Sequence, residues 1–168
     1  MSERFAVRVA SPKLHFNAAH FVAFGPDDCE PIHGHDFHVS ALVEGRLSPT
    51  GWVIDFHILE GGLAKVIRDF DHALLLPESS PWVNVAKDGP FLEIAAGRRF
   101  WRFPAGDCRL LPIPNVTAEL LAQHIGLCFR KELLAQFGDH AGNLDAVTVE
   151  LSESEGCSAS WRMTFGQV

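Results

Sequence analysis

The chain has 168 residues, of which 47% are hydrophobic and 21% are charged, and its formal net charge is −7. This length and composition predict one globular domain over residues 1–168. The acidic balance, without any cluster of lysine and arginine, argues against a nucleic-acid partner. No apolar run approaches the roughly 20 residues that span a bilayer, and the N-terminal segment lacks the apolar stretch of a secretory signal. We therefore expect a cytoplasmic protein with no membrane partner.

Two strands and a helix are expected in the first half of the chain. Residues 4–16 alternate between polar and apolar side chains, which predicts a half-buried strand. Residues 17–32 contain Gly25-Pro-Asp-Asp28 and Pro31 and predict a loop. Alternation returns over 33–45, so this segment is expected to form a hairpin with the first strand. Apolar residues then recur at helical spacing over 57–70, which predicts an amphipathic helix.

The second half predicts an insertion, a helix and two strands. The segment 77–113 is rich in proline with short β-type pieces, and predicts an insertion that contains a small hairpin. A helix is expected from Thr117 to about Phe137, followed by a turn over 138–143. Strands over 145–152 and 159–165 close the chain. This order of elements predicts an α+β fold with an antiparallel sheet and helices on one face.

The stretch Cys29-Glu-Pro-Ile-His33-Gly-His35 is a candidate metal site. Side chains two residues apart leave the same face of a strand, so His33 and His35 can reach one ion, although an isolated H-x-H is also consistent with two half-exposed strand histidines. His20, at the end of the first predicted strand, would come close to His33 in an antiparallel hairpin. Three neutral imidazoles with an open fourth position are typical of catalytic zinc. Cys29 could instead complete a structural site with four ligands, and both interpretations stay open.

Two further acidic positions are candidates for chemistry. Asp71 precedes His72, and a carboxylate beside an imidazole can form a proton-transfer pair. The alternative is a favourable charge at the end of a helix. Glu153 lies near the end of a predicted strand, where a solvated acidic rim is the simpler interpretation.

Several motifs occur in one order along the chain: Phe16-Asn-Ala-Ala-His20, Cys29-x3-His33-Gly-His35, Val53-Ile-Asp55-Phe56, Asp71-His72, Thr117-Ala-Glu119, and Glu153 followed by Trp161. In this order and spacing the sequence resembles the 6-pyruvoyltetrahydropterin synthase / 6-carboxytetrahydropterin synthase family. The resemblance runs from about residue 5 to residue 165 and is interrupted by the insertion at 77–113. The chain departs from the family pattern at Asp36, Phe37 and Trp161, where Asn, Tyr and Tyr are usual.

The resemblance implies the tunnelling fold, an antiparallel four-stranded sheet backed by two helices. Subunits of this fold associate through their sheets into an oligomeric β-barrel, so the partner would be a second copy of the chain. The expected assembly is a homohexamer made of two stacked trimers. Its active sites would lie between subunits.

The resemblance also implies a role for each candidate residue. Three residues would bind Zn²⁺: His20, His33 and His35. Cys29 would be the general base, and Asp71 with His72 would form a proton relay that acts with Cys29 of a neighbouring subunit. Glu153 would anchor the pterin ring through its carboxylate, and Thr117 would lie beside the ring.

The implied reaction converts 7,8-dihydroneopterin triphosphate to 6-carboxytetrahydropterin, with release of acetaldehyde and triphosphate, on the route to 7-deazaguanine compounds such as queuosine. One alternative is the 6-pyruvoyltetrahydropterin synthase reaction, which only eliminates triphosphate. A second is a folate-type cleavage of the side chain that uses Glu30, the neighbour of Cys29. A non-catalytic alternative is a zinc- or pterin-binding module in which Cys29 is the fourth ligand.

Overall fold

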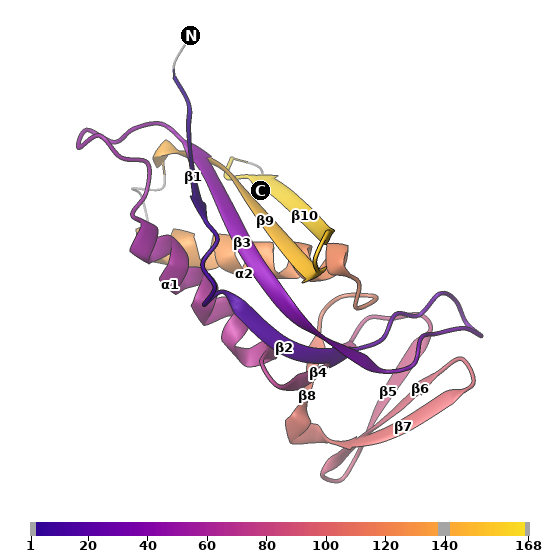
Figure 1. Cartoon of the computed structure of the whole chain (residues 1–168). Coiled ribbons are helices and arrows are strands. Elements are labelled where there is room, and N and C mark those ends of the chain that lie inside the picture. Colours follow the sequence, from indigo (N-terminus) through magenta and orange to yellow (C-terminus); the bar gives the residue numbers. More distant parts are fainter. Residues whose placement is uncertain (1–2, 138–141, 167–168) are drawn as a thin grey trace.

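The computed structural model describes residues 3–137 and 142–166, which form a large sheet, a small sheet and two long helices (Figure 1). The elements follow in chain order: β1 (Phe5–Val9), β2 (His15–His20), β3 (His33–Gly45), α1 (Phe56–Ile67), the 3-10 turn η1 (Arg68–Phe70), β4 (Ala73–Pro77), β5 (Val83–Asp88), β6 (Phe91–Ala96), β7 (Arg99–Pro104), η2 (Ala105–Asp107), β8 (Cys108–Leu111), α2 (Ala118–Phe137), β9 (Leu144–Ser154) and β10 (Cys157–Thr164). This arrangement confirms the α+β class.

The large sheet has seven strands in the order β10-β9-β3-β2-β4-β8, and β1 also pairs with β3. It therefore exceeds the four strands that the resemblance implies. The single strand expected over 4–16 is two strands, because the chain turns between them at Ser11, whose carbonyl accepts from Leu14 N–H at 2.9 Å. The strands β4 and β8 extend the sheet further, through parallel pairing with β2 and with each other.

The helices agree closely with the prediction, while the first loop begins later than expected. Strand β2 continues to His20, because its ladder to β3 holds every position from residue 15 to residue 20. Asp55 caps α1, its side chain accepting from the N–H of His57 at 2.7 Å. Thr117 precedes α2 and accepts from the N–H of Leu120 at 3.4 Å. Most of the turn predicted over 138–143 lies outside the described residues.

The segment 77–113 is more structured than the small hairpin that the sequence predicts. It contains the three-stranded antiparallel sheet β5-β6-β7 and ends in β8. Figure 1 shows this small sheet at the end of the molecule opposite β1. One face of the small sheet packs in a second hydrophobic cluster with Phe21, Cys29 and Leu76. The insertion is thus packed against the segment that leads from β2 to β3.

The main core lies between the large sheet and the two helices. Its largest buried side chains come from the sheet and from both helices, and include Phe16, Phe37, Leu59, Leu63, Leu121 and Phe129. The helix α2 approaches β10 so closely that Gly126 lies directly against the indole of Trp161. Among the described helices, neither is long and apolar enough to cross a membrane.

Gly126 provides a test of this packing, with Gly61 of α1 as a matched control. A Cβ at Gly126 would lie 2.4 Å from the Trp161 ring, whereas a Cβ at the exposed Gly61 would meet nothing within 4 Å. Alanine is worth about 1 kcal/mol over glycine inside a helix, and overpacking a core costs roughly 1–3 kcal/mol. We expect Gly61→Ala to raise the free energy of unfolding and Gly126→Ala to lower it, as measured by urea denaturation. Equal stabilisation by both changes would contradict the described contact.

Candidate metal centre and active site

Three histidines converge where β2 meets β3. His20 and His33 are directly opposite each other in the antiparallel ladder, and His35 lies two residues further along β3 on the same side. Each offers one ring nitrogen, and these nitrogens all lie within 4.8 Å of one another. The ring centroids are 4.6 to 5.3 Å apart. Among the described residues, this is the cluster that could hold a metal ion.

Hydrogen bonds to backbone carbonyls leave a ligand nitrogen free on two of these rings. Nδ1 of His20 donates to the carbonyl of Val116 at 2.8 Å, and Nδ1 of His33 donates to the carbonyl of Pro31 at 3.0 Å. Since a carbonyl can only accept, both rings carry their proton on Nδ1 and a lone pair on Nε2. His20 is 1% exposed, and its Nε2 has no hydrogen-bond partner. A metal ion would satisfy this otherwise orphaned acceptor.

The environment of His20 favours the neutral ring that metal binding requires. Burial lowers the pKa of His20 below its usual value, and the neighbouring His33 and His35 lower it further. The Val116 carbonyl and the charge of Glu153 act in the opposite direction. The lowered pKa keeps the lone pair of His20 available near neutral pH.

Phe37, where the chain departs from the family pattern, supports the histidine cluster. Its ring is fully buried and lies 5.5 Å from the ring centroids of both His20 and His35. It also stacks on Phe16 of β2 at 5.0 Å. This packing limits the rotation of two of the histidines. The alternation of β3 is the signal that could have found Phe37, whereas the carbonyl of Val116 leaves no signal in the sequence.

The side chains of Cys29 and Glu30 lie in different surroundings. The thiol of Cys29 is buried among the side chains of the second cluster and donates to the carbonyl of Ala96 at 3.3 Å. It is not part of the group of described residues that could hold a metal. The carboxylate of Glu30 accepts from Val22 N–H at 3.2 Å and lies 3.9 Å from Nδ1 of His33. The carboxylate of Glu30 therefore lies beside the outer, proton-bearing nitrogen of His33, while the thiol of Cys29 lies against the small sheet.

Asp71 and His72 form a close pair beside β2, as their adjacency suggests. One carboxylate oxygen of Asp71 accepts from Asn17 N–H at 2.9 Å, and the other lies 3.0 Å from Nδ1 of His72. The bond from Asn17 is the main reason that the pKa of Asp71 is lowered, and the pairing with His72 adds to it. Both residues are thus tied to the backbone of Asn17, three residues before His20 on the same strand.

His72 has an unusual backbone. Its φ is 58°, in the left-handed region that non-glycine residues rarely adopt. Its N–H donates to the carbonyl of Asn17 at 2.7 Å, which holds the conformation in place. The imidazole itself is exposed, with 80% of its side-chain surface accessible. Strain at an exposed histidine is typical of functional sites.

The two expected substrate-binding residues lie at the histidine end of the fold. Glu153, near the end of β9, is half-buried and close enough for its charge to influence the pKa of His20. Thr117 directly follows Val116, whose carbonyl binds His20. The hydroxyl of Thr117 already caps α2 through the N–H of Leu120. Both residues therefore adjoin the cluster.

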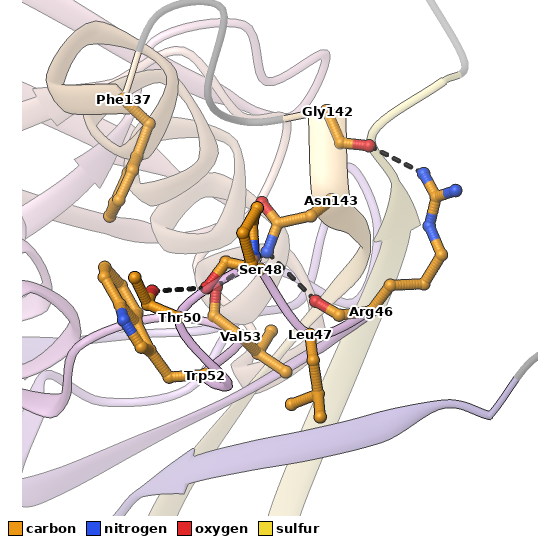
Figure 2. Close-up of a pocket in the computed structure, with 10 residues that line it drawn as sticks. Arg46, Leu47, Ser48, Thr50, Trp52, Val53, Phe137, Gly142 and Asn143 are labelled. Atoms are coloured by element: carbon orange, nitrogen blue, oxygen red, sulfur yellow. Dashed lines mark hydrogen bonds between the residues drawn. The ribbon is translucent and has the colours of Figure 1, made fainter.

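A large, mainly apolar pocket is remote from this cluster. Its volume is about 610 Å³, and the residues that line it include Leu47, Trp52, Val53, Phe137 and Asn143 (Figure 2). It lies beyond Gly45, at the end of β3 opposite His33, which is roughly 40 Å away along the strand. Figure 2 shows Arg46 turned to the carbonyl of Gly142, which accepts at 2.8 Å. None of the three histidines lines this pocket.

Comparison with known proteins places the chain in a family. The family model of 6-pyruvoyl tetrahydropterin synthase matches residues 10–164. A protein of Methanocaldococcus jannaschii, provisionally named 6-carboxy-5,6,7,8-tetrahydropterin synthase, is 30% identical over 151 residues, which are 89% of this chain and 90% of that protein.

Solved structures match as well. The crystal structure of 6-pyruvoyl tetrahydropterin synthase from Plasmodium vivax superposes with a TM-score of 0.91 at 29% identity, covering 98% of this chain and 100% of that one. The segment 77–113 therefore has a counterpart there. Variants of the Plasmodium protein in which a glutamate is replaced are described as catalytic-residue mutants. With the family model and a relative that each span most of its length, the chain belongs to the 6-pyruvoyl tetrahydropterin synthase family.

Proposed function

We propose that the protein is a zinc-dependent lyase that converts 7,8-dihydroneopterin triphosphate to 6-carboxytetrahydropterin, with release of acetaldehyde and triphosphate. The observation that carries the proposal is the cluster of three ring nitrogens within 4.8 Å, one of them buried and without a partner. The name of the Methanocaldococcus jannaschii relative supports the product. The reaction would serve the synthesis of 7-deazaguanine compounds such as queuosine.

The donor set fits zinc. Three residues would hold the ion: His20, His33 and His35. Neutral imidazoles are usual zinc ligands, and a site with three of them leaves a position for substrate. Bound there, zinc would hold the side-chain hydroxyls of the substrate and acidify the neighbouring carbon-bound protons. The carbonyl of Val116 and the ring of Phe37 would keep His20 in its binding orientation.

Metal content tests this assignment directly. We expect wild-type protein to retain about one zinc per chain and His35→Ala to lose it, because two imidazoles bind zinc far more weakly than three. The control is His38→Ala, which removes an exposed histidine of the same strand that is not in the cluster. Elemental analysis of purified protein gives the zinc content, and circular dichroism checks folding. Wild-type protein that binds no zinc even after reconstitution would refute the proposal.

The pterin ring would be held by residues that adjoin the metal. The carboxylate of Glu153 would accept two hydrogen bonds from the guanidine-like edge of the ring, a pairing that fixes orientation. Thr117 would lie beside the ring. Both assignments are supported by the position of these residues next to His20 and the carbonyl that binds it.

The base that moves the proton is either Cys29 or Glu30. Cys29 is the base that the sequence resemblance implies, but its thiol is buried and bonded to Ala96. Glu30 presents its carboxylate next to His33. The glutamate variants of the Plasmodium protein, which are described as catalytic-residue mutants, support a second candidate function, cleavage of the substrate side chain to 6-hydroxymethyldihydropterin with Glu30 as base.

Product analysis with two variants separates these functions. Wild-type protein with dihydroneopterin triphosphate is expected to yield 6-carboxytetrahydropterin and acetaldehyde by mass spectrometry. 6-Hydroxymethyldihydropterin would assign the second function, and 6-pyruvoyltetrahydropterin would indicate elimination of triphosphate alone. We expect Glu30→Gln to lower kcat by about 100-fold, the usual effect of losing a general base.

Cys29→Ser is the informative partner variant. A serine hydroxyl can still donate to the carbonyl of Ala96, but it is a far weaker base than a thiolate. With Glu30 as the base, the loss of the thiol does not remove the base, and we expect Cys29→Ser to retain most of the turnover. A loss of kcat with Cys29→Ser and not with Glu30→Gln would assign the base to Cys29. Zinc lost from Cys29→Ser would instead indicate a four-ligand structural site.

Asp71 and His72 are proposed as the proton relay, and the backbone of His72 offers a test. Left-handed φ costs a non-glycine residue roughly 1–2 kcal/mol, whereas an exposed ion pair is worth at most about 1 kcal/mol. We expect His72→Gly to maintain or raise the free energy of unfolding while kcat falls by about 100-fold. His72→Asn, which tolerates the same backbone, is expected to lose turnover equally. Turnover unchanged in both variants would exclude the relay.

We also propose that the active form is a homo-oligomer, with a hexamer of two stacked trimers as the expected state. Strand β10 ends the sheet order, and it therefore offers an open edge to a second copy of the chain. The exposure of Asp71 and His72 supports a site completed between subunits.

A further inference from the structure

The turn between β6 and β7 contacts the loop that carries Cys29 and Glu30. We refer to Ala96–Arg99 as the 96–99 turn and to residues 21–32 as the active-site loop. The carbonyl of Ala96 accepts from the thiol of Cys29, and the guanidinium Nε of Arg99 donates to the Cys29 carbonyl, both at 3.3 Å. A Cβ on Gly97 would lie 2.9 Å from the backbone of Asp27. The turn therefore contacts the backbone of the loop as well as the side chain of Cys29.

The active-site loop is also braced from within. Ala23 and Cys29 form an antiparallel bridge, and next to it Glu30 N–H donates to the carbonyl of Val22 at 3.0 Å. The side-chain amide of Asn115 accepts from the N–H of Ala23 at 3.1 Å and donates to its carbonyl at 2.8 Å. In this extended backbone, consecutive side chains leave opposite sides. Holding Cys29 against the small sheet thus turns Glu30 away from that sheet.

We propose that the 96–99 turn is a clamp that holds Cys29 against the small sheet and Glu30 beside His33, and so determines which of the two acts on the substrate. This inference rests on the proposed function. It gives the segment 77–113 a role in the reaction, because the residues of the clamp position a loop without touching the substrate themselves.

The clamp depends on two residues that lie close together in the sequence, Gly97 and Arg99. Gly97 has a φ of +56°, as expected for the first residue of a two-residue hairpin turn, and its missing side chain allows the contact with Asp27. Arg99 supplies a directional bond from a charged donor. The adjacent Arg98 makes no hydrogen bond or ion pair that the described residues reveal, although it lies close to the same loop.

The chain provides a matched control for each feature. Gly89 occupies the equivalent place in the β5–β6 turn with a φ of +57°, but a Cβ there meets nothing within 4 Å. Gly89→Ala therefore introduces the same backbone strain as Gly97→Ala without pressing on the active-site loop. In the same way, Arg98→Met is the control for Arg99→Met. It removes the neighbouring arginine and leaves the bond from Arg99 to Cys29 intact.

Thiol accessibility measures the clamp without relying on catalysis. Zinc-loaded protein is treated with iodoacetamide, and the alkylation rate of Cys29 is followed by peptide mass spectrometry, which separates it from the other three cysteines. We expect Gly97→Ala and Arg99→Met to accelerate the alkylation of Cys29 by about tenfold, the effect of losing one charge-assisted bond or forcing the contact apart. Gly89→Ala and Arg98→Met should label like the wild type. Arg99→Lys, which can still donate to the carbonyl, should restore slow labelling.

Kinetics then tests the consequence for the reaction. In the same variants, Gly97→Ala and Arg99→Met are expected to lower kcat by about tenfold with unchanged zinc content, or to change the ratio of products, while the two controls do neither. Equal labelling and equal kinetics in Gly97→Ala and Gly89→Ala would overturn the clamp. Accelerated labelling with unaltered kcat and products would overturn its role in the reaction. A wild-type enzyme that leaves dihydroneopterin triphosphate intact would overturn the proposed function, and the labelling result would still decide whether the clamp exists.

Discussion

The pairing of β2 with β3 is the interaction on which the candidate site depends. Its register places His20 opposite His33, and the two-residue period of a strand then brings His35 to the same side. A slip of one residue would turn one set of side chains to the other face and disperse the cluster. The register is stabilised by the buried residues that share this face, Phe16 on β2 and Phe37 on β3, which stack on each other in the core.

The site combines this ladder with the start of α2. A buried imidazole is costly unless its polar atoms are satisfied, and the carbonyl of Val116 satisfies only one nitrogen of His20. The other nitrogen is aimed into the cluster, and burial together with the two neighbouring imidazoles lowers the pKa of the ring, which favours its neutral form. The fold thus accepts an unfavourable group at this position, which is the expected pattern for a metal ligand.

The small sheet links the insertion to the same end of the molecule. Apart from the small sheet, the loop between β2 and β3 is braced by its own hydrogen bonds, including the one from Val22 to Glu30, and by Asn115. The second hydrophobic cluster joins this loop to β4 and β6 and buries Cys29. A segment that reads as an insertion in the sequence is therefore part of the support of the active-site loop.

The sequence by itself determined the α+β class, both helices, the three histidines and the Asp71–His72 pair, because these depend on spacing within one strand or helix and on a single hairpin between strands that are close in the chain. Only the tertiary structure decided which way Cys29 and Glu30 face, which carbonyl orients His20, and how many strands the sheet contains. These depend on contacts between segments far apart in the chain, such as Cys29 with Ala96 and His20 with Val116. Alternation and helical periodicity describe one segment at a time and carry no information about such partners.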